Sequence, residues 1–158
     1  MPVDGSNDSI LSMSLQEMVT FRISRLHARL SAQAAEVLKK NGGISLMQWR
    51  ILVMLEPHGA ITPAEIVRQT KLDKGQLSRA VKTMVEQGLI TSTPSESDQR
   101  SHVLGFTEKG MQVFRVARPH MRQRQMHLLS SLTDAERAAT FAALEKLEAA
   151  ADSLEAEL

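Results

Sequence analysis

The sequence predicts a mainly α-helical chain with one small β-hairpin. Apolar residues recur at steps of three and four over most of its length, which is typical of amphipathic helices. Several helix starts are marked by Ser, Thr or Asp followed three residues later by Gln or Glu, the pattern of a capping box. Two short runs rich in β-branched residues, 89–93 and 102–106, flank a polar segment and indicate the hairpin.

Length and composition limit the possible classes. The 158 residues suffice for one domain with its own core. The formal net charge is only +1, but basic residues cluster at 22–29, 68–82 and 115–124, and 134–157 is mostly acidic. Cysteine is absent, which excludes disulfides, thiolate zinc sites and thiol redox sensing. With no secretory pattern and no apolar run near the ~18 residues of a membrane span, we expect a cytoplasmic protein that does not enter the membrane.

The N-terminal part combines an arm and a long helix. Residues 1–12 are polar and are expected to form a mobile arm, whereas 13–158 is expected to be a single domain. From about Ser14 the apolar residues follow helical spacing until Asn41, Gly42 and Gly43. Such a helix is longer than a domain of this size needs to cover its core. Part of its apolar face is therefore expected to meet another chain.

Three short helices should follow. Ser45 with Gln48 opens the first, in which Trp49, the only tryptophan, is expected to anchor the core. The second begins with an N-cap, a helix-initiating proline and a capping-box glutamate: Thr62, Pro63 and Glu65. It ends near Thr70, and about three residues later Asp73 opens the third. Two short helices joined by a tight turn are the arrangement of a helix-turn-helix.

The third helix, 73–88, is predicted to be the recognition helix for DNA. Asp73 caps its start and Gly88 supplies a left-handed stop. Its polar face is expected to contact base edges and phosphates, the bases through Gln76, Ser78 and Arg79 and the phosphates through Lys74 and Lys82. An ordinary amphipathic surface helix has the same pattern in isolation, and the preceding helix and turn favour recognition.

The hairpin should form a wing beside that helix. Its tip, 94–101, contains Asp98 and Arg100. An arginine in this place is well positioned to enter a minor groove, where the negative potential favours it. Asp98 is expected to hold the arginine or the backbone of the tip. The alternative is that Asp98 and Arg100 form an exposed surface ion pair, which contributes little to stability.

Two further helices complete the chain. Thr107 caps the first, which Pro119 is expected to kink. Thr133 and Glu136 form the capping box of the second. That last helix carries a short heptad seam: Leu144, Leu147, Ala151, Leu154 and Leu158. We therefore expect the helices at both chain ends to form a homodimer interface.

These parts predict a winged helix-turn-helix at 45–106 between dimerisation helices at 13–40 and 107–158. In this the chain resembles the MarR family of regulators, over roughly 15–158. The most specific part of the match is ungapped: LDKGQLSRAVKTMVEQGLI, then Pro94, DQR at 98–100 and FTEKG at 106–110.

The resemblance implies a cytoplasmic homodimer that binds palindromic double-stranded promoter DNA. Most such regulators repress, and a small anionic aromatic ligand or another signal releases them. Ser92 and Gln99 stand where the family pattern has basic residues. Both departures weaken the expected electrostatic grip of the wing and leave the expected fold unchanged.

A ligand site is expected where the dimer helices meet the winged domain. Trp49 is expected to offer an aromatic wall, His27 to lie toward the apolar side of the first helix, and Arg115 to face a ligand carboxylate. Each residue has a plain structural alternative. Trp49 fits the core, His27 fits a packed polar position, and Arg115 fits as a partner of the acidic last helix.

Other functions find less support. No nucleophile, base and orienting group have a catalytic spacing, so we expect neither an enzyme nor a cofactor. His120 and His127 are two turns apart and could share a metal with His27, but without cysteine or a nearby carboxylate we expect no metal site. The competing function is a winged-helix module that binds proteins and not DNA. The basic edge of the 73–88 helix favours DNA.

Overall fold

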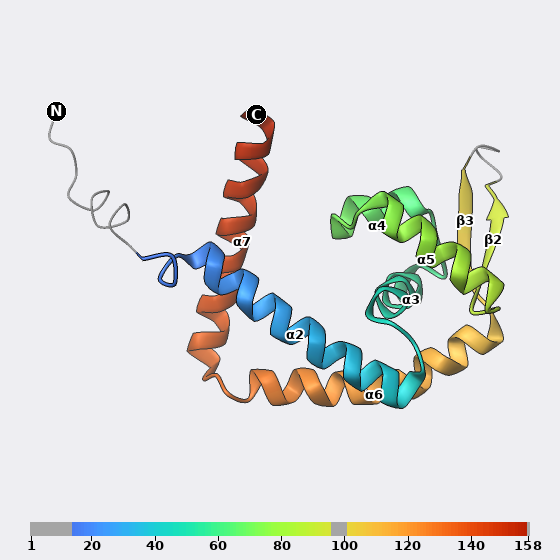
Figure 1. Ribbon diagram of the computed structural model, residues 1–158, viewed down its shortest axis with the longest axis horizontal. Coiled ribbons are helices and arrows are strands. Elements are labelled where there is room, and N and C mark those ends of the chain that lie inside the picture. The colour runs from blue at the N-terminus through green and yellow to red at the C-terminus, as the bar shows by residue number, and fades with distance from the viewer. Residues whose placement is uncertain (1–13, 96–100, 158) are drawn as a thin grey trace, which may run out of the picture. The chain divides into compact units, whose positions relative to one another are not determined.

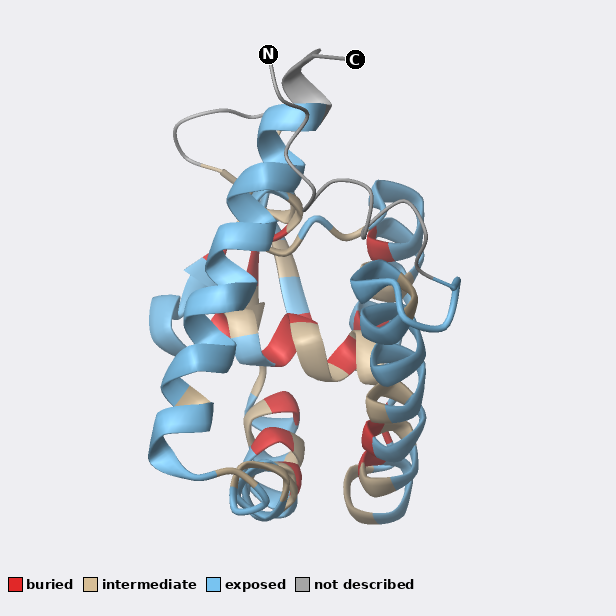
Figure 2. Ribbon diagram, turned by 90° about the vertical axis from the view of Figure 1, so that its left-hand side faces the viewer, coloured by how far each residue is buried: buried red, intermediate tan, exposed pale blue. Residues whose placement is uncertain are grey.

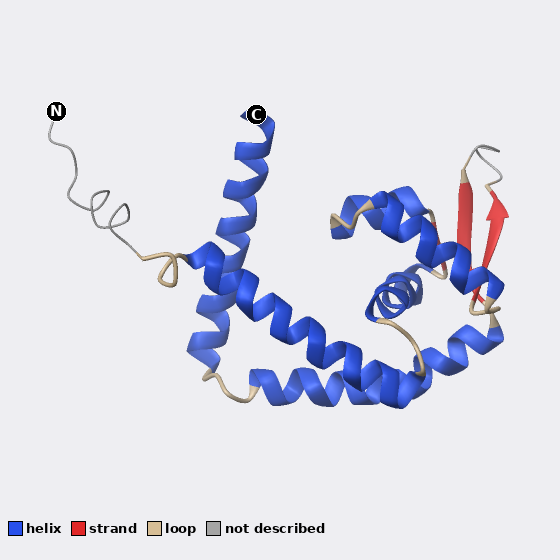
Figure 3. Ribbon diagram, viewed as in Figure 1, coloured by secondary structure: helices blue, strands red, loops and turns tan. Residues whose placement is uncertain are grey.

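The computed structural model describes residues 14–95 and 101–157, so the predicted arm at 1–12 lies outside the described residues (Figure 1). Its elements are α2 (Val19–Gly42), α3 (Leu46–His58), β1 (Ala60–Ile61), α4 (Pro63–Thr70), α5 (Lys74–Glu86), β2 (Ile90–Pro94), β3 (His102–Phe106), α6 (Glu108–Leu129) and α7 (Asp134–Glu157). Helices predominate beside one small sheet (Figure 3), which confirms the predicted fold class. Contacts divide the chain into two compact units, Met1–Ala117 and Arg118–Leu158.

The first long helix begins later than predicted. α2 starts at Val19 rather than near Ser14. The Glu17 carboxylate accepts both the N–H and the O–H of Ser14, at 2.9 and 2.7 Å, and closes a separate turn. Met18 is extended and makes no side-chain cap bond, so the chain becomes helical only after it. Gly43, at φ 64°, ends α2 in the left-handed region, as predicted.

The predicted starts of α3 and α4 are confirmed, with one correction. Ser45 and Gln48 form a full capping box at the start of α3, with bonds of 2.8 and 3.2 Å. Thr62 accepts the N–H of Glu65 at 3.2 Å. The Glu65 carboxylate turns forward to the guanidinium of Arg68 rather than back to Thr62, because an opposite charge lies within reach. That hydrogen bond is the main cause that lowers the pKa of Glu65.

The helix-turn-helix consists of α4, a three-residue turn and α5. Lys71 opens the turn at φ 53°, in the left-handed region. Asp73 caps α5 by accepting the N–H of Gln76 at 2.8 Å. Gly88, at φ 68°, follows the end of α5. Both ends of the predicted recognition helix are therefore confirmed.

The sheet is antiparallel with strand order β1-β3-β2. β3 occupies the predicted range, and β2 is shifted by one residue, to Ile90–Pro94. The short extended segment 60–61 pairs with β3, with Ile61 opposite Leu104. The predicted hairpin therefore gains an edge strand from the segment before α4.

The core lies in the first unit, around α3. This helix packs against α2, α5 and the sheet. Figure 2 shows the buried residues in red. The largest fully buried side chains come from α2 to α5 and both hairpin strands: Leu38, Ile51, Leu52, Leu55, Ile66, Leu77, Met84, Ile90 and Leu104. Burying each contributes about 1.5–3 kcal/mol.

The second unit contains the C-terminal part of α6 together with the whole of α7. Pro119 lies inside α6, and its kink stays a prediction. Thr133 and Glu136 form the predicted capping box, with bonds of 2.8 and 3.3 Å. α7 is exposed over almost its whole length (Figure 2), and Leu147 and Leu154 are 44% and 61% exposed. Among the described residues, none of the helices combines the length and the hydropathy needed to cross a membrane.

Candidate nucleic-acid interface

The exposed edge of α5 carries five of the six side chains that were predicted to contact DNA. Successive residues are about 100° apart around a helix, so these side chains form two rows. Lys74, Ser78 and Lys82 make one row, and Gln76 and Arg79 make the other. The opposite side of α5 is buried in the core. The edge therefore presents two adjacent strips of hydrogen-bonding and charged groups.

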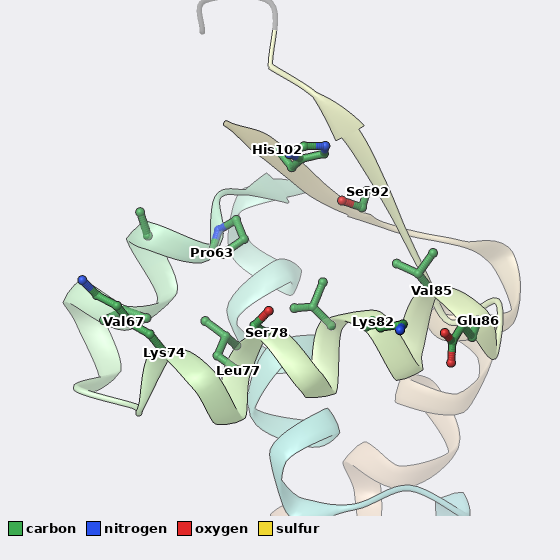
Figure 4. Close-up of a pocket in the computed structure, with 12 residues that line it drawn as sticks. Pro63, Val67, Lys74, Leu77, Ser78, Lys82, Val85, Glu86, Ser92 and His102 are labelled. Atoms are coloured by element: carbon green, nitrogen blue, oxygen red, sulfur yellow. The ribbon is translucent and has the colours of Figure 1, made fainter. Parts of the chain in front are cut away.

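A groove of about 780 Å³ runs along the first row (Figure 4). Lys74, Ser78 and Lys82 border it on α5, and Ser92 and His102 border it on the strands. Its apolar lining comes from α4 and α5: Pro63, Ala64, Val67, Leu77, Val81 and Val85. Ammonium groups beside an apolar surface suit a nucleic-acid strand, whose phosphates are anionic and whose thymine methyl groups are apolar.

Ser92 and His102 line the groove but were not predicted from the sequence as candidate site residues. Side chains alternate between the two faces of a strand, so Ser92 shares a face with buried Ile90, and His102 shares one with buried Leu104. Both lie on the face that covers the core, at the part that continues into the groove. Strand alternation was the signal that could have found them.

Charge along the α5 edge is mostly positive. Lys74, Arg79 and Lys82 are exposed cations, and Glu86 lines the C-terminal end of the groove. The Arg79 side chain extends back over the first turn, because its Nη1 lies 3.5 Å from the Cβ position of Gly75. An edge for protein contacts would be apolar or acidic, so this charge pattern favours DNA.

The described part of the wing consists of β2, β3 and the residues that follow and precede them. The Ser95 N–H donates to the carbonyl of Ser101 at 2.9 Å, which extends the hairpin beyond both strands. Asp98 and Arg100 lie outside the described residues. Insertion of Arg100 into a minor groove therefore stays a prediction.

The three predicted ligand residues lie on three different helices, His27 on α2, Trp49 on α3 and Arg115 on α6. The Trp49 ring stacks on Phe114, with centroids 5.2 Å apart. His27 is exposed on α2, and its Nε2 lies 3.4 Å from the Ser31 hydroxyl. Arg115 is exposed on α6. The roles of these three residues in ligand binding stay predictions. Within the described ranges, no three histidine, aspartate or glutamate side chains gather as a possible metal site.

The segment that contains α5 and the hairpin is also the part of the chain that matches a known protein family. The sequence profile of the MarR family matches residues 42–101, from the end of α2 to the wing. The organic hydroperoxide resistance transcriptional regulator of Bacillus subtilis is 33% identical over 98 residues, which are 62% of this chain and 66% of that regulator. The repressor IacR of Pseudomonas putida is 26% identical over 114 residues, 72% of this chain and 68% of the repressor. The chain belongs to the MarR family. It is a transcriptional regulator, and the winged helix-turn-helix is its DNA-binding part.

Solved structures agree with this assignment. A MarR/EmrR family regulator from Acinetobacter sp. ADP1 superposes with a TM-score of 0.82 at 26% identity, covering 89% of this chain and 99% of that one. Two others share the fold at lower identity. An E. coli MarR variant complexed with operator DNA has a TM-score of 0.69 at 22% identity, covering 86% and 99%. The organohalide-sensing regulator RdhR with 2,4-dichlorophenol has 0.74 at 20%, covering 93% and 84%.

Proposed function

We propose that this MarR-family chain represses transcription as a homodimer on a palindromic promoter and leaves the DNA when a small aromatic anion binds. The observation that carries the proposal is the two-row, mostly basic edge of α5 beside the groove. In this function the chain binds and does not catalyse, and it acts in the cytoplasm with the DNA.

The DNA contacts divide between the rows of α5. Arg79 forks onto a guanine, Gln76 pairs with an adenine, and Ser78 reaches a base edge or phosphate. Lys74 and Lys82 neutralise phosphates. Arg100 of the wing enters the minor groove, where the potential is most negative. The complex of the E. coli relative with operator DNA supports this use of the fold.

The homodimer is proposed from exposed apolar surface. Leu147 and Leu154 of α7 are largely exposed, and so is Leu26 of α2, although burying a leucine contributes about 1.5–3 kcal/mol. Charge also favours pairing between copies. α2 carries exposed Arg22, Arg25 and Arg29, whereas α7 carries exposed Glu145, Glu148 and Asp152.

The ligand is proposed to be an aromatic anion that binds near Trp49, His27 and Arg115. An aromatic ring stacks on indole, and a guanidinium holds a carboxylate or phenolate. The relative RdhR was solved with 2,4-dichlorophenol, which supports an aromatic ligand. The two recognition helices of a dimer must keep one separation to fit both half-sites, so a ligand that changes this separation weakens DNA binding.

The experiment that tests the proposal is selection from a random duplex pool with the purified full-length chain. We expect a palindromic sequence with half-sites about one helical turn, roughly 34 Å, apart. Fluorescence anisotropy then compares the selected duplex with a shuffled duplex of equal composition. Equal affinities for the two duplexes at physiological salt would reject sequence-specific regulation and favour a protein-interaction module.

A further inference from the structure

The end of α5 is held by two other helices. Gln48 of α3 donates through Nε2 to the Oε1 atom of Gln87 at 2.7 Å. Lys109 of α6 donates through Nζ to the carbonyl of Gln87 at 2.7 Å. The Thr107 hydroxyl, just before α6, lies 2.7 Å from the carbonyl of Gly88. Segments far apart in the chain therefore meet at residues 87–89.

Gln48 is the buried polar side chain at this junction, with 8% of its surface exposed. Its Oε1 accepts the N–H of Ser45 at 2.8 Å. A backbone N–H can only donate, so this bond fixes which end of the Gln48 amide carries the oxygen. Nε2 must then face Gln87, which presents its oxygen. One buried amide thus caps α3 and holds the end of α5.

The backbone of α6 also rests directly on this junction. Thr107 accepts the N–H of Gly110 at 2.9 Å, and its hydroxyl lies 3.0 Å from the carbonyl of Leu89. The same carbonyl lies 1.8 Å from the position that a Cβ atom would occupy on Gly110. The first turn of α6 can therefore shift little without moving residues 88–89, which follow α5.

A small rotation of α5 about this junction produces a large displacement at the opposite end of the helix. The 13 residues of α5 span about 20 Å at 1.5 Å per residue. A tilt of about 10° at Gln87 therefore moves Lys74 by about 3 Å, which exceeds the tolerance of a hydrogen bond. The contacts at the C-terminal end of α5 therefore control where its N-terminal residues, such as Lys74, lie.

We propose that Gln48 is a positioning residue for DNA binding, which acts through Gln87 to set the direction of the recognition helix. It does so without touching the DNA. The inference rests on the proposed binding of DNA by α5. The N-terminal turn of α6 contributes the second support of the same joint.

A double-mutant cycle tests the proposal. Gln48→Met, Gln87→Met and the double variant remove the amides without changing net charge. Gln112→Met, at an exposed position of α6, is the control. We expect each single variant to bind the selected duplex about three- to tenfold more weakly, the loss expected for the hydrogen bond between Gln48 and Gln87, which both variants remove. The double variant should be no weaker than the weaker single variant, and the salt dependence should be unchanged because no phosphate contact is lost.

Three outcomes would overturn the proposal. Unchanged affinity with only a lower melting temperature would assign Gln48 a purely structural role. A shallower salt dependence in Gln87→Met would mean that this residue itself lies at the phosphates. Additive losses in the double variant would mean that the two amides act separately. All affinities are measured well below the melting temperature of each variant.

A second measurement does not require DNA. The chain has no cysteine, so nitroxide labels on Glu36→Cys in α2 and Thr83→Cys in α5, both exposed, report one distance within a protomer when diluted with unlabelled protein. We expect pulsed EPR to give a broader distance distribution in Gln87→Met and an unchanged one in Gln112→Met. An unchanged distance distribution in both Gln87→Met and Gln112→Met would reject the proposal that Gln48 and Gln87 position α5. Absence of DNA binding by the wild type would reject the proposed function alone.

Discussion

A Cβ atom on Gly110 would lie 1.8 Å from the carbonyl oxygen of Leu89. The obstacle is backbone, so no side-chain rotamer relieves it. We expect Gly110→Ala to lower the free energy of unfolding by about 3 kcal/mol or more. Gly75→Ala is the matched control, because its nearest neighbours are the ends of the Asp73 and Arg79 side chains, at 3.3 and 3.5 Å. It should be neutral or stabilise α5 by up to ~1 kcal/mol. Urea unfolding measures both, and equal stabilities would contradict the close packing of α6 on Leu89.

Arg79 and Lys82 are expected to contribute differently to DNA binding. Arg79→Ala should cost about 1–3 kcal/mol and relax the preference at one base pair, because a bidentate base contact is lost. Lys82→Ala should weaken binding to all duplexes alike and reduce the salt dependence by about one phosphate. Anisotropy titrations on the selected duplex and its single-base variants, at several salt concentrations, distinguish the two. Identical losses with an unaltered base preference would refute these roles.

The seam on α7 is expected to hold the dimer. Leu147→Glu places a charge on the apolar face and should shift the chain to monomer at micromolar concentration, because a buried leucine contributes about 1.5–3 kcal/mol. Ala149→Glu adds the same charge two residues away, on the opposite side of the helix, and should leave the dimer intact. Sedimentation velocity measures both variants. A folded wild-type monomer at micromolar concentration would rule out the interface.

Ligand binding and DNA binding are expected to oppose each other. A ligand that favours the wrong helix separation by about 2.7 kcal/mol lowers DNA affinity about a hundredfold, and DNA must weaken the ligand equally. Trp49 is the only tryptophan, so its fluorescence reports titrations with salicylate-like compounds. Arg115→Met should weaken binding of the anion and spare its neutral amide analogue. Calorimetry with and without the selected duplex measures the coupling, and identical constants in both would show that the site is not regulatory.

The Glu136 capping box predicts an acid dependence of stability. The backbone N–H of Thr133, followed by its hydroxyl, holds the pKa of Glu136 below its usual 4.5. A lowered folded pKa gives stability that is present above the unfolded pKa and is lost as pH falls through the folded pKa. Glu136→Gln keeps an acceptor but does not titrate. We expect its deficit in melting temperature to be larger at about pH 6 than at about pH 3.5, and a constant deficit would contradict the assignment.

Most of the secondary structure could be predicted from the sequence. The signals at Ser45, Asp73, Gly88 and Thr133 each act over three or four residues, so the sequence contains both partners of each bond. Ser14 shows the limit of such reasoning. A nearby carboxylate made a turn there that competed with the helix, and apolar spacing carries no information on that competition.

Some features of the candidate site could likewise be predicted from the sequence, and others could not. Exposure of the five α5 residues followed from helical periodicity, because one side of α5 had to be buried. The groove did not follow, since Ser92 and His102 reach it through pairing of β2 with β3. The stacking of Trp49 on Phe114 likewise depends on how two distant helices pack.

By itself the sequence determined where the helices of the winged domain begin and end and which edge of α5 is polar and basic, because these depend on neighbours within one or two turns. Only the tertiary structure decided the direction in which α5 points. Gln48 and Gln87 are separated by 39 residues, and Leu89 meets Gly110 only when the sheet and α6 are folded. Such contacts form after distant segments have been brought together, and no local pattern specifies which of many possible partners will meet.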